Sequence, residues 1–470
     1  MNDGSAVAAV TQQTPSVRGA LASLALAMLL SSLGTSIANV GLPSLAQAFS
    51  APFAQVQWVV IAYLLSITTL IVSVGRLGDL VGRRRLLLGG IALFTLASAL
   101  CGLAPGLGLL IAARALQGLG AAVMMALTLA FVGETVAKGK TGSAMGLLGT
   151  LSAIGTAIGP ALGGLLIGGF GWRSIFLISV PLGLLAWLLA QRYLPEDRQV
   201  QNTREGFDPL GTLLLAVTLA AYALAMTLGR GHFGLPNIAL LLAACLGLGL
   251  FLRVEARVAT PLVRLALFRD GRLSGSLAMS LLVATVMMTT LVVGPFYLSQ
   301  TLRLTPVGIG WVLSVGPLVA ALSGVPAGRS VDRFGAPGMT LAGLLGMALG
   351  SFALSVVPER FGVGGYLVPM VGVTLGYAVF QTANNTAVML EVQPDQRGVV
   401  SGLLNLSRNL GLVTGASALS AVFALASASA DIGTAQPQAI ASGMRMTFMA
   451  ALGLIVVACL IAWRRQADKR

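Results

Sequence analysis

The sequence predicts an all-α polytopic membrane protein made of two pseudo-symmetric six-helix bundles plus a central helix pair, and three observations predict it. Only 9% of the 470 residues are charged and 56% are hydrophobic, whereas about 25% of a soluble domain is charged. Uncharged runs such as 86–113 and 273–302 exceed the roughly 20 residues that a bilayer-spanning helix needs. One loop motif also occurs twice, at matching places in the two halves. Because a helix satisfies its backbone hydrogen bonds within one segment, we expect each span to be helical.

Fourteen apolar segments are expected to cross the membrane. They lie at 19–41, 56–75, 86–104, 107–134, 142–169, 173–191, 208–229, 236–252, 273–300, 307–328, 336–357, 363–390, 398–427 and 441–463. The first is too long for the apolar part of a signal peptide, so we interpret it as a span. The predicted divisions are a cytoplasmic tail, an N-terminal bundle, a linker with two additional transmembrane helices, a C-terminal bundle and a second cytoplasmic tail, at 1–18, 19–192, 193–272, 273–463 and 464–470.

The basic charge of the chain indicates its orientation. The net charge is +14, and with the N-terminus inside, 22 of the 29 Lys and Arg fall on cytoplasmic segments. Cytoplasmic loops of membrane proteins carry this excess of basic residues. We therefore expect both termini in the cytoplasm, a bacterial-type inner (plasma) membrane and a lipid bilayer around the chain. The charge predicts no nucleic-acid partner.

Two cytoplasmic loops share one pattern. The loop after the second span reads GRLGDLVGRRR from residue 75, and a loop in the second half reads GRSVDRFG from residue 328. Both have Gly, then Asp four positions on, then Gly three further, at Gly75, Asp79 and Gly82 and at Gly328, Asp332 and Gly335. A parallel repeat of this kind is typical of transporters built from two related six-helix halves.

With two further stretches, RALQGLGA from residue 114 and GTLSAIGTAIGPALGG from residue 149, these loops carry a family resemblance. The sequence resembles the major facilitator superfamily, and within it the fourteen-helix drug:proton antiporter family of multidrug efflux type, over nearly the whole chain. The residues that match its loop, fourth-helix and fifth-helix signatures are Gly75, Leu77, Asp79, Gly82, Arg83, Arg114, Gln117, Gly118, Ala121, Gly155, Gly159, Pro160, Gly163 and Gly164.

The resemblance implies roles for the loops and for the fifth helix. It implies that Asp79 and Arg83, between Gly75 and Gly82, latch the two halves when the cytoplasmic side is closed. Asp332 and Arg333 are expected to have an analogous but weaker role. For the fifth-helix signature it implies a hinge that limits leak and favours export. The alternatives are a basic loop that only orients the protein and a fifth helix that is only tightly packed.

The fifth-helix glycines have a direct physical interpretation. Gly155, Gly159 and Gly163 are four residues apart and therefore share one helix face. Without side chains on that face, a neighbouring helix can approach closely. Pro160 lacks an N–H, frees the carbonyl of Thr156 and is expected to kink the helix.

Two arginines are predicted to lie inside the membrane. Arg114 is some seven residues into the fourth span, about 10 Å deep at 1.5 Å per residue, with Gln117 on the same face. Arg408, in NLSRNLG, is closer to a helix end. Charged residues in spans are rare and usually face a polar interior. Each arginine has a functional role or pairs structurally with helix carbonyls.

The first span departs from the family pattern. The family commonly has D-x-T-I-x-N-x-A-L-P here, whereas this sequence reads GTSIANVGLP, with Gly34 in place of the acid. Glu134 and Glu391 come closest to lying inside a span, and His232, the single histidine, is predicted in an external loop. Proton coupling is therefore implied by the resemblance alone. The candidates for it are Glu134, Asp79 and Arg114, although arginine does not readily deprotonate.

The substrate cavity is expected to be mostly apolar with a few amides. The candidate lining residues are Asn39, Trp58, Tyr63, Gln117, Tyr297, Gln300, Gln381, Asn384 and Asn385. Such a cavity suits neutral or weakly anionic amphiphiles, with Arg114 or Arg408 as the counter-charge. The alternative for each lining residue is that it only holds helices together.

The sequence as a whole predicts a secondary active transporter that exports small amphiphilic, drug-like compounds by alternating access, with protons as the coupling ion. An uptake carrier or facilitator for a specific metabolite, and a non-transporting membrane sensor, are the alternatives. Cys101, Cys245 and Cys459 lie singly in apolar segments. With no metal-ligand spacing and no cluster of acids, His or Cys, we expect no enzyme activity, no metal and no cofactor. No obligate protein partner is indicated.

Overall fold

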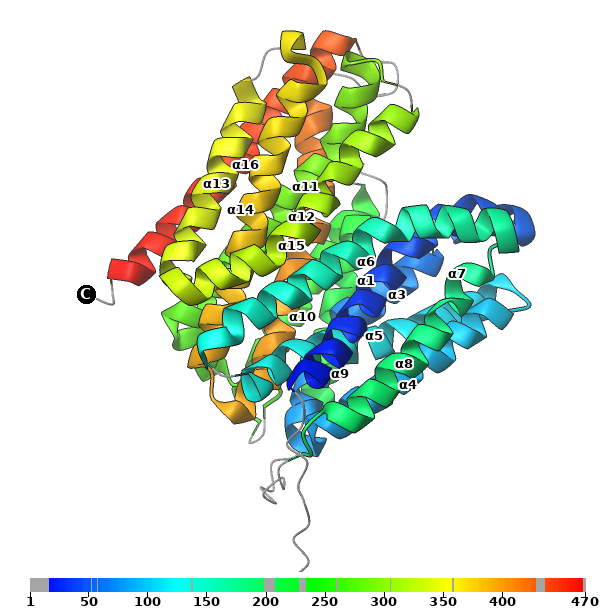
Figure 1. The fold of residues 1–470 in the computed structure, drawn as a ribbon, viewed down its shortest axis with the longest axis vertical. Coiled ribbons are helices and arrows are strands. Elements are labelled where there is room, and N and C mark those ends of the chain that lie inside the picture. Colours follow the sequence, from blue (N-terminus) through cyan, green and yellow to red (C-terminus); the bar gives the residue numbers. More distant parts are fainter. Residues whose placement is uncertain are drawn as a thin grey trace, which may run out of the picture.

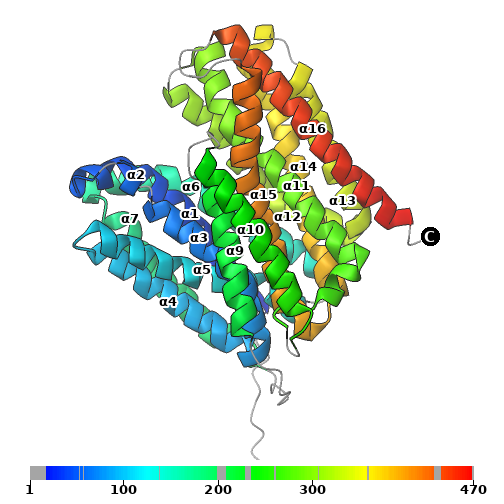
Figure 2. The same ribbon diagram turned by 180° about the vertical axis from the view of Figure 1, so that it is seen from behind.

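The computed structural model describes residues 17–467, except for 52, 57, 137, 198–207, 228–233, 259–260, 305, 357–358 and 428–435. This part of the chain is helical and has no strand. Fourteen of its helices are long and apolar enough to cross a membrane. The predicted fold class is therefore confirmed, and Figures 1 and 2 show the two bundles side by side.

The N-terminal bundle has six long helices that pack in a fixed pattern. The first and fifth, α1 and α6, pack against each other, and α1 also packs on α8, while α3 and α4 both pack on α5. The bundle contains α1 (Val17–Ala48), α2 (Phe53–Val56), α3 (Trp58–Val81), α4 (Arg83–Leu103), α5 (Leu107–Thr135), η1 (Lys138–Lys140), α6 (Thr141–Phe170), α7 (Ser174–Leu177) and α8 (Ser179–Tyr193). The span predicted at 173–191 is thus two helices with a break at Ile178.

The C-terminal bundle repeats this pattern. Its first and fifth helices, α11 and α15, pack together, α11 packs on α16, and α12 and α13 both pack on α14. The elements are η2 (Leu265–Arg269), α11 (Gly271–Phe296), a π-helical turn η3 (Tyr297–Thr301), α12 (Pro306–Phe334), α13 (Ala336–Val356), η4 (Glu359–Phe361), α14 (Gly362–Glu391), η5 (Pro394–Gln396), α15 (Arg397–Ala426) and α16 (Pro437–Ala467). Several helices extend beyond the predicted apolar runs because charge marks the membrane surface and not the helix end.

The two bundles contact each other through a crossed pair of interfaces. The fifth helix of each bundle packs on the second helix of the other, α6 on α12 and α15 on α3. In Figures 1 and 2 the bundles lie together at the end where α1 begins, and they splay apart toward α2 and α7. The molecule therefore has one joined end and one separated end.

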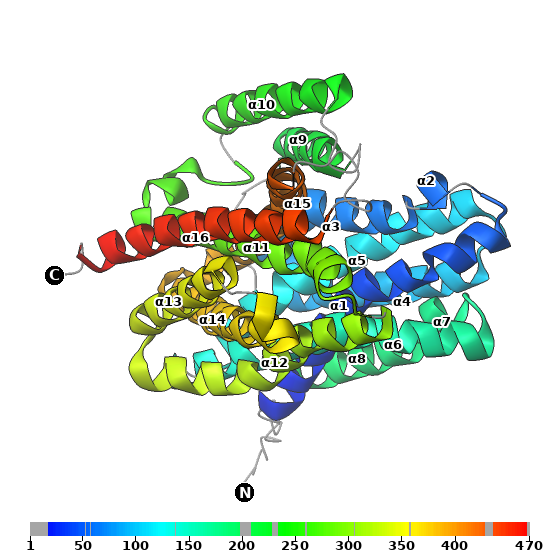
Figure 3. The same ribbon diagram turned by 90° about the horizontal axis from the view of Figure 1, so that it is seen from above.

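The central helix pair lies outside both bundles. It consists of α9 (Pro209–Thr227) and α10 (Leu235–Glu255), and α9 packs on α3 and α15, beside the seam between the bundles. Ser417 of α15 donates a hydrogen bond to the Met226 carbonyl, which ties α9 to the C-terminal bundle. Figure 3 shows α10 as the outermost helix. Its leucines, such as Leu242 and Leu246, are exposed to what is lipid in a membrane.

Candidate functional site

Asp79, in the last turn of α3, contacts the C-terminal bundle at the joined end of the molecule. This carboxylate accepts hydrogen bonds from the backbone N–H groups of Gly398 and Val399, each at 3.1 Å. Both belong to the first turn of α15, where the N–H groups have no partner within the helix. The positive end of the helix dipole favours an acid there. An acid of one bundle therefore caps a helix of the other.

Arg83 extends this contact. Its Nε and Nη2 donate to Asp79 at 3.0 and 2.7 Å, and Nη2 also donates to the Pro394 carbonyl in η5, directly before α15. Gly82 has φ 109°, a conformation that favours glycine. A Cβ on Gly75 would overlap the Gly398 carbonyl. Close approach of α3 and α15 thus requires glycine at this position.

Asp332 makes the reciprocal contact. It accepts hydrogen bonds from the N–H groups of Gly142 at 2.8 Å and Ser143 at 2.9 Å, and from the Ser143 hydroxyl at 2.5 Å, in the first turn of α6. Gly335 has φ 83°. Arg333, predicted to assist Asp332, is exposed, with its guanidinium 5.2 Å from the Phe334 ring centroid. The two acids thus make crossed contacts between the bundles, and the contact of Asp79 includes Arg83.

The glycine face of α6 lies against α1. A Cβ on Gly155 would lie 2.6 Å from the Leu29 carbonyl, and one on Gly159 would overlap the Ser36 hydroxyl. Gly163 is also close to α1, at 3.2 Å from Ile37, whereas a Cβ on Gly164 would meet no atom within 4 Å. Pro160 lies within α6, and its side chain is outside the described part.

Arg114 is fully buried inside the N-terminal bundle. Its Nε donates to the Val59 carbonyl at 2.9 Å, Nη1 to the Gln117 side-chain oxygen at 2.5 Å, and Nη2 to the Gly34 carbonyl at 3.1 Å. The guanidinium also lies 4.1 Å from the Tyr63 ring centroid. These contacts join α1, α3 and α5. The structural interpretation of Arg114, pairing with helix carbonyls, is the one its surroundings match.

The missing acid of the first span has a local explanation. A Cβ on Gly34 would lie 2.8 Å from the Tyr63 hydroxyl, which donates to the Ser31 carbonyl at 2.7 Å. Tyr63 therefore occupies the space that a side chain at position 34 needs. Arg114 bonds the backbone of Gly34 in place of a carboxylate.

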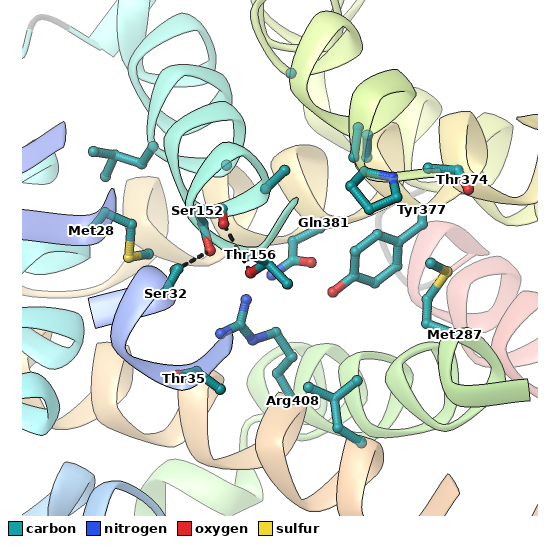
Figure 4. Close-up of a pocket in the computed structure, with 18 of the residues that line it drawn as sticks. Met28, Ser32, Thr35, Ser152, Thr156, Met287, Thr374, Tyr377, Gln381 and Arg408 are labelled. Carbon is teal, nitrogen blue, oxygen red and sulfur yellow. Dashed lines mark hydrogen bonds between the residues drawn. The ribbon is translucent and has the colours of Figure 1, made fainter. Parts of the chain in front are cut away.

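A cavity of about 380 Å³ lies between the bundles (Figure 4). Its described lining comes from α1, α3, α5 and α6 of one bundle and from α11, α12, α14 and α15 of the other. Six methionines give it an adaptable apolar surface, namely Met28, Met125, Met145, Met287, Met288 and Met370. Small polar groups interrupt that surface, among them Ser32, Thr35, Ser152, Thr156 and Thr374.

Arg408 is the one charged side chain among the described residues that line this cavity. It extends from α15 toward Thr35, Thr156 and Tyr377, as Figure 4 shows. Its buried Nε has no hydrogen-bond partner. The Tyr377 hydroxyl of α14 is within reach of both an electrostatic interaction and a hydrogen bond with Arg408. The two intramembrane arginines of the sequence thus have different surroundings.

Of the nine predicted cavity residues, Gln381 and Asn385 line this cavity. The other seven do not. Tyr63, Gln117, Tyr297 and Asn384 are buried within the bundles, Asn39 and Trp58 are exposed, and Gln300 is half-buried in η3. For these seven the prediction is corrected, because a polar residue on an apolar helix faces either its own bundle or the other one, and spacing does not distinguish the two. The Glu134 side chain and His232 lie outside the described part.

The sequence did contain one signal for the missed lining residues. Thr374, Ala378, Gln381 and Asn385 recur at intervals of four, three and four on α14, which places them on one helix face. Ser152 and Thr156 have the same relation on α6. The lining methionines carry no comparable signal because methionine is also common in buried cores.

A helical membrane protein with two repeated six-helix bundles, crossed contacts between them and a cavity at their interface is of the transporter class. A family model described as Major Facilitator Superfamily matches residues 24–416, and the chain belongs to this superfamily.

Curated relatives and a solved structure agree with this assignment. The riboflavin transporter RibZ of Clostridioides difficile (strain 630) is 31% identical over 402 residues, covering 85% of this chain and 87% of that protein. The multidrug resistance protein Stp of Mycobacterium tuberculosis is 34% identical over 394 residues, covering 83% and 72%. The proton:xylose symporter XylE has a TM-score of 0.69 at 16% identity and covers 95% of both chains.

Proposed function

We propose that this transporter exports small amphiphilic compounds across the inner membrane by alternating access, with proton antiport as its energy source. The observation that carries the proposal is the cavity of about 380 Å³ between two bundles that are latched together at one end. Its volume and its largely apolar lining suit a drug-sized compound. The positive-inside pattern of the sequence makes the latched end cytoplasmic, so the proposal assigns the structure to an outward-facing state.

The latches supply the two-state element that alternating access needs. Asp79 and Asp332 each bond a helix of the opposite bundle, so both contacts exist only when this end is closed. Opening toward the cytoplasm breaks both. A ligand or a proton shifts this equilibrium only by the difference in its affinity for the two states.

In this proposal Asp79 is the group whose protonation couples proton movement to opening of the latch. Protonation would remove the negative charge that α15 and Arg83 bind, and would therefore favour release of the latch. Among the described residues that line the cavity there is no acid. Arg114 is a poor carrier because each of its three guanidinium nitrogens donates a hydrogen bond and the group does not readily deprotonate.

A carrier for a specific metabolite is the second candidate. RibZ, named as a riboflavin transporter, is similar to this chain over most of both lengths. The polar groups of the cavity, such as Gln381 and Asn385, suit a compound with several hydrogen-bonding groups.

The test is dye accumulation in an efflux-deficient host that expresses the protein, with and without a protonophore. Reduced accumulation that the protonophore abolishes is expected. The test variant is Asp79→Asn, which keeps the shape of the latch, removes its charge and is expected to reduce the export that the protonophore abolishes. If no dye of a cationic, neutral and anionic panel is exported, the export proposal is wrong and the metabolite carrier is favoured.

A further inference from the structure

The cavity has a positive charge that the described protein does not neutralise. Arg408 lines it, the Nε of Arg408 lacks a hydrogen-bond partner, and no acid occurs among the other described lining residues. Arg114 shows the contrast, since each of its three nitrogens donates to an oxygen of its own bundle. Arg408 therefore makes fewer contacts with protein oxygens than Arg114, and it lines the cavity with Tyr377 beside it.

The groups around Arg408 suit an organic anion. A guanidinium binds a carboxylate or sulfonate through parallel hydrogen bonds. Thr35 and Thr156, on the facing wall, and Gln381, beside it on α14, offer further hydrogen-bonding groups within the same cavity. The methionine surface then accommodates the apolar body of the ligand.

During alternating access the positive charge of Arg408 is enclosed in the protein. When both ends of the cavity are closed, a charge inside it loses its contact with bulk water, which is costly unless a counter-charge is present. An anion on Arg408 supplies that counter-charge. A cationic ligand would instead place a second positive charge in the same closed space.

We propose that Arg408 is the specificity-determining residue of the cavity and that the substrates are amphiphilic organic anions, with a carboxylate or sulfonate joined to an apolar body. The proposal rests on the proposed transport function because it concerns the same cavity. It narrows the substrate class from amphiphiles in general to those with a negative charge.

The experiment is equilibrium binding of three pyrene compounds that differ in charge, to the full-length protein in lipid nanodiscs. The probes are pyrenebutyrate, pyrenebutanol and pyrenylbutyl-trimethylammonium, followed by fluorescence titration with empty nanodiscs subtracted. The wild-type protein is expected to bind the anion about tenfold more tightly than the alcohol, and the cation most weakly. This ranking tests the proposal without any variant.

Three variants locate the preference. Arg408→Gln is expected to weaken pyrenebutyrate binding about tenfold and to leave pyrenebutanol binding unchanged, while Arg408→Lys retains most of the preference. The matched control is Arg445→Gln, an exposed arginine of α16 that does not line the cavity. The proposal is overturned if the alcohol binds as tightly as the anion, or if Arg408→Gln weakens all three ligands equally.

Equilibrium binding depends neither on a proton gradient nor on the direction of transport. This experiment therefore tests the anion site separately from the export proposal. An anion preference in nanodiscs without energised efflux in cells would refute the export proposal alone. Energised efflux of cations, with no anion preference in binding, would refute the anion site and leave export in place.

Discussion

The interior of the N-terminal bundle and the cavity between the bundles each contain an arginine, and the two arginines have different hydrogen-bond partners. In the interior, Arg114 is fully buried and donates to the carbonyls of Val59 and Gly34 and to Gln117. In the cavity, Arg408 is half-buried and its Nε has no partner. Depth in the membrane is therefore a poor guide to function, and the partners of a charge distinguish a structural arginine from one available to a ligand.

The largest expected effect comes from truncating the two arginines. Arg114→Ala would leave two buried carbonyls and Gln117 without their donor, at about 1–3 kcal/mol for each unsatisfied group, so we expect a loss of about 3 kcal/mol or more. Arg408→Ala removes a contact with Tyr377 at a half-buried site. It is therefore expected to cost less than Arg114→Ala, about 1 kcal/mol. The measurement is thermal unfolding of both purified variants in one detergent. A lower Tm for Arg408→Ala than for Arg114→Ala would contradict the comparison.

Two glycines of α6 allow a similar comparison, because Gly159 lies on the face packed against α1 and Gly164 has no neighbouring atom within 4 Å of a Cβ. Gly159→Ala would place a methyl group on Ser36, and overpacking of this kind costs typically about 1–3 kcal/mol. Gly164→Ala meets no atom within 4 Å, so the helix preference of Ala is expected to leave stability unchanged or raise it by up to about 1 kcal/mol. Unfolding of the matched pair under the same conditions measures the difference. Equal destabilisation by both would show that the close packing of α1 on α6 is not what glycine provides.

Much of this architecture follows from the sequence, and the site does so only in part. The fourteen spans follow from uncharged runs. The loop predicted around Gly75, Asp79 and Gly82 is shorter in the structure, because α3 continues to Val81 and only Gly82 separates it from α4. Gln381 and Asn385 were predicted to line the cavity and do so. Tyr63 and Gln117 were also predicted to line it, but they are buried within the N-terminal bundle. A polar residue inside an apolar helix signals an inward face, but which of two inward faces it occupies depends on how helices distant in sequence pack.

The smallest expected effect concerns the interface itself, where each bundle caps a helix of the other. Asp79→Asn removes the charge that bonds Gly398 and Val399 and that also holds Arg83 beside Pro394. We expect it to favour the open cytoplasmic end by about 1.4 kcal/mol, a factor of about ten. Asp332→Asn lacks the arginine component and is expected to shift the equilibrium by about 1 kcal/mol, a factor of about five.

Distances between spin labels on Val81 and Gln393, in a background without native cysteines, report this equilibrium. Both sites belong to the latched end but to different bundles, and both are exposed. The latches engage separate helices, α15 and α6, so the free-energy shifts of the double variant are expected to add. If either single variant already opened the cytoplasmic end as far as the double variant does, the free-energy shifts would not add. The contacts of Asp79 and Asp332 would then act as one unit and not as two independent latches.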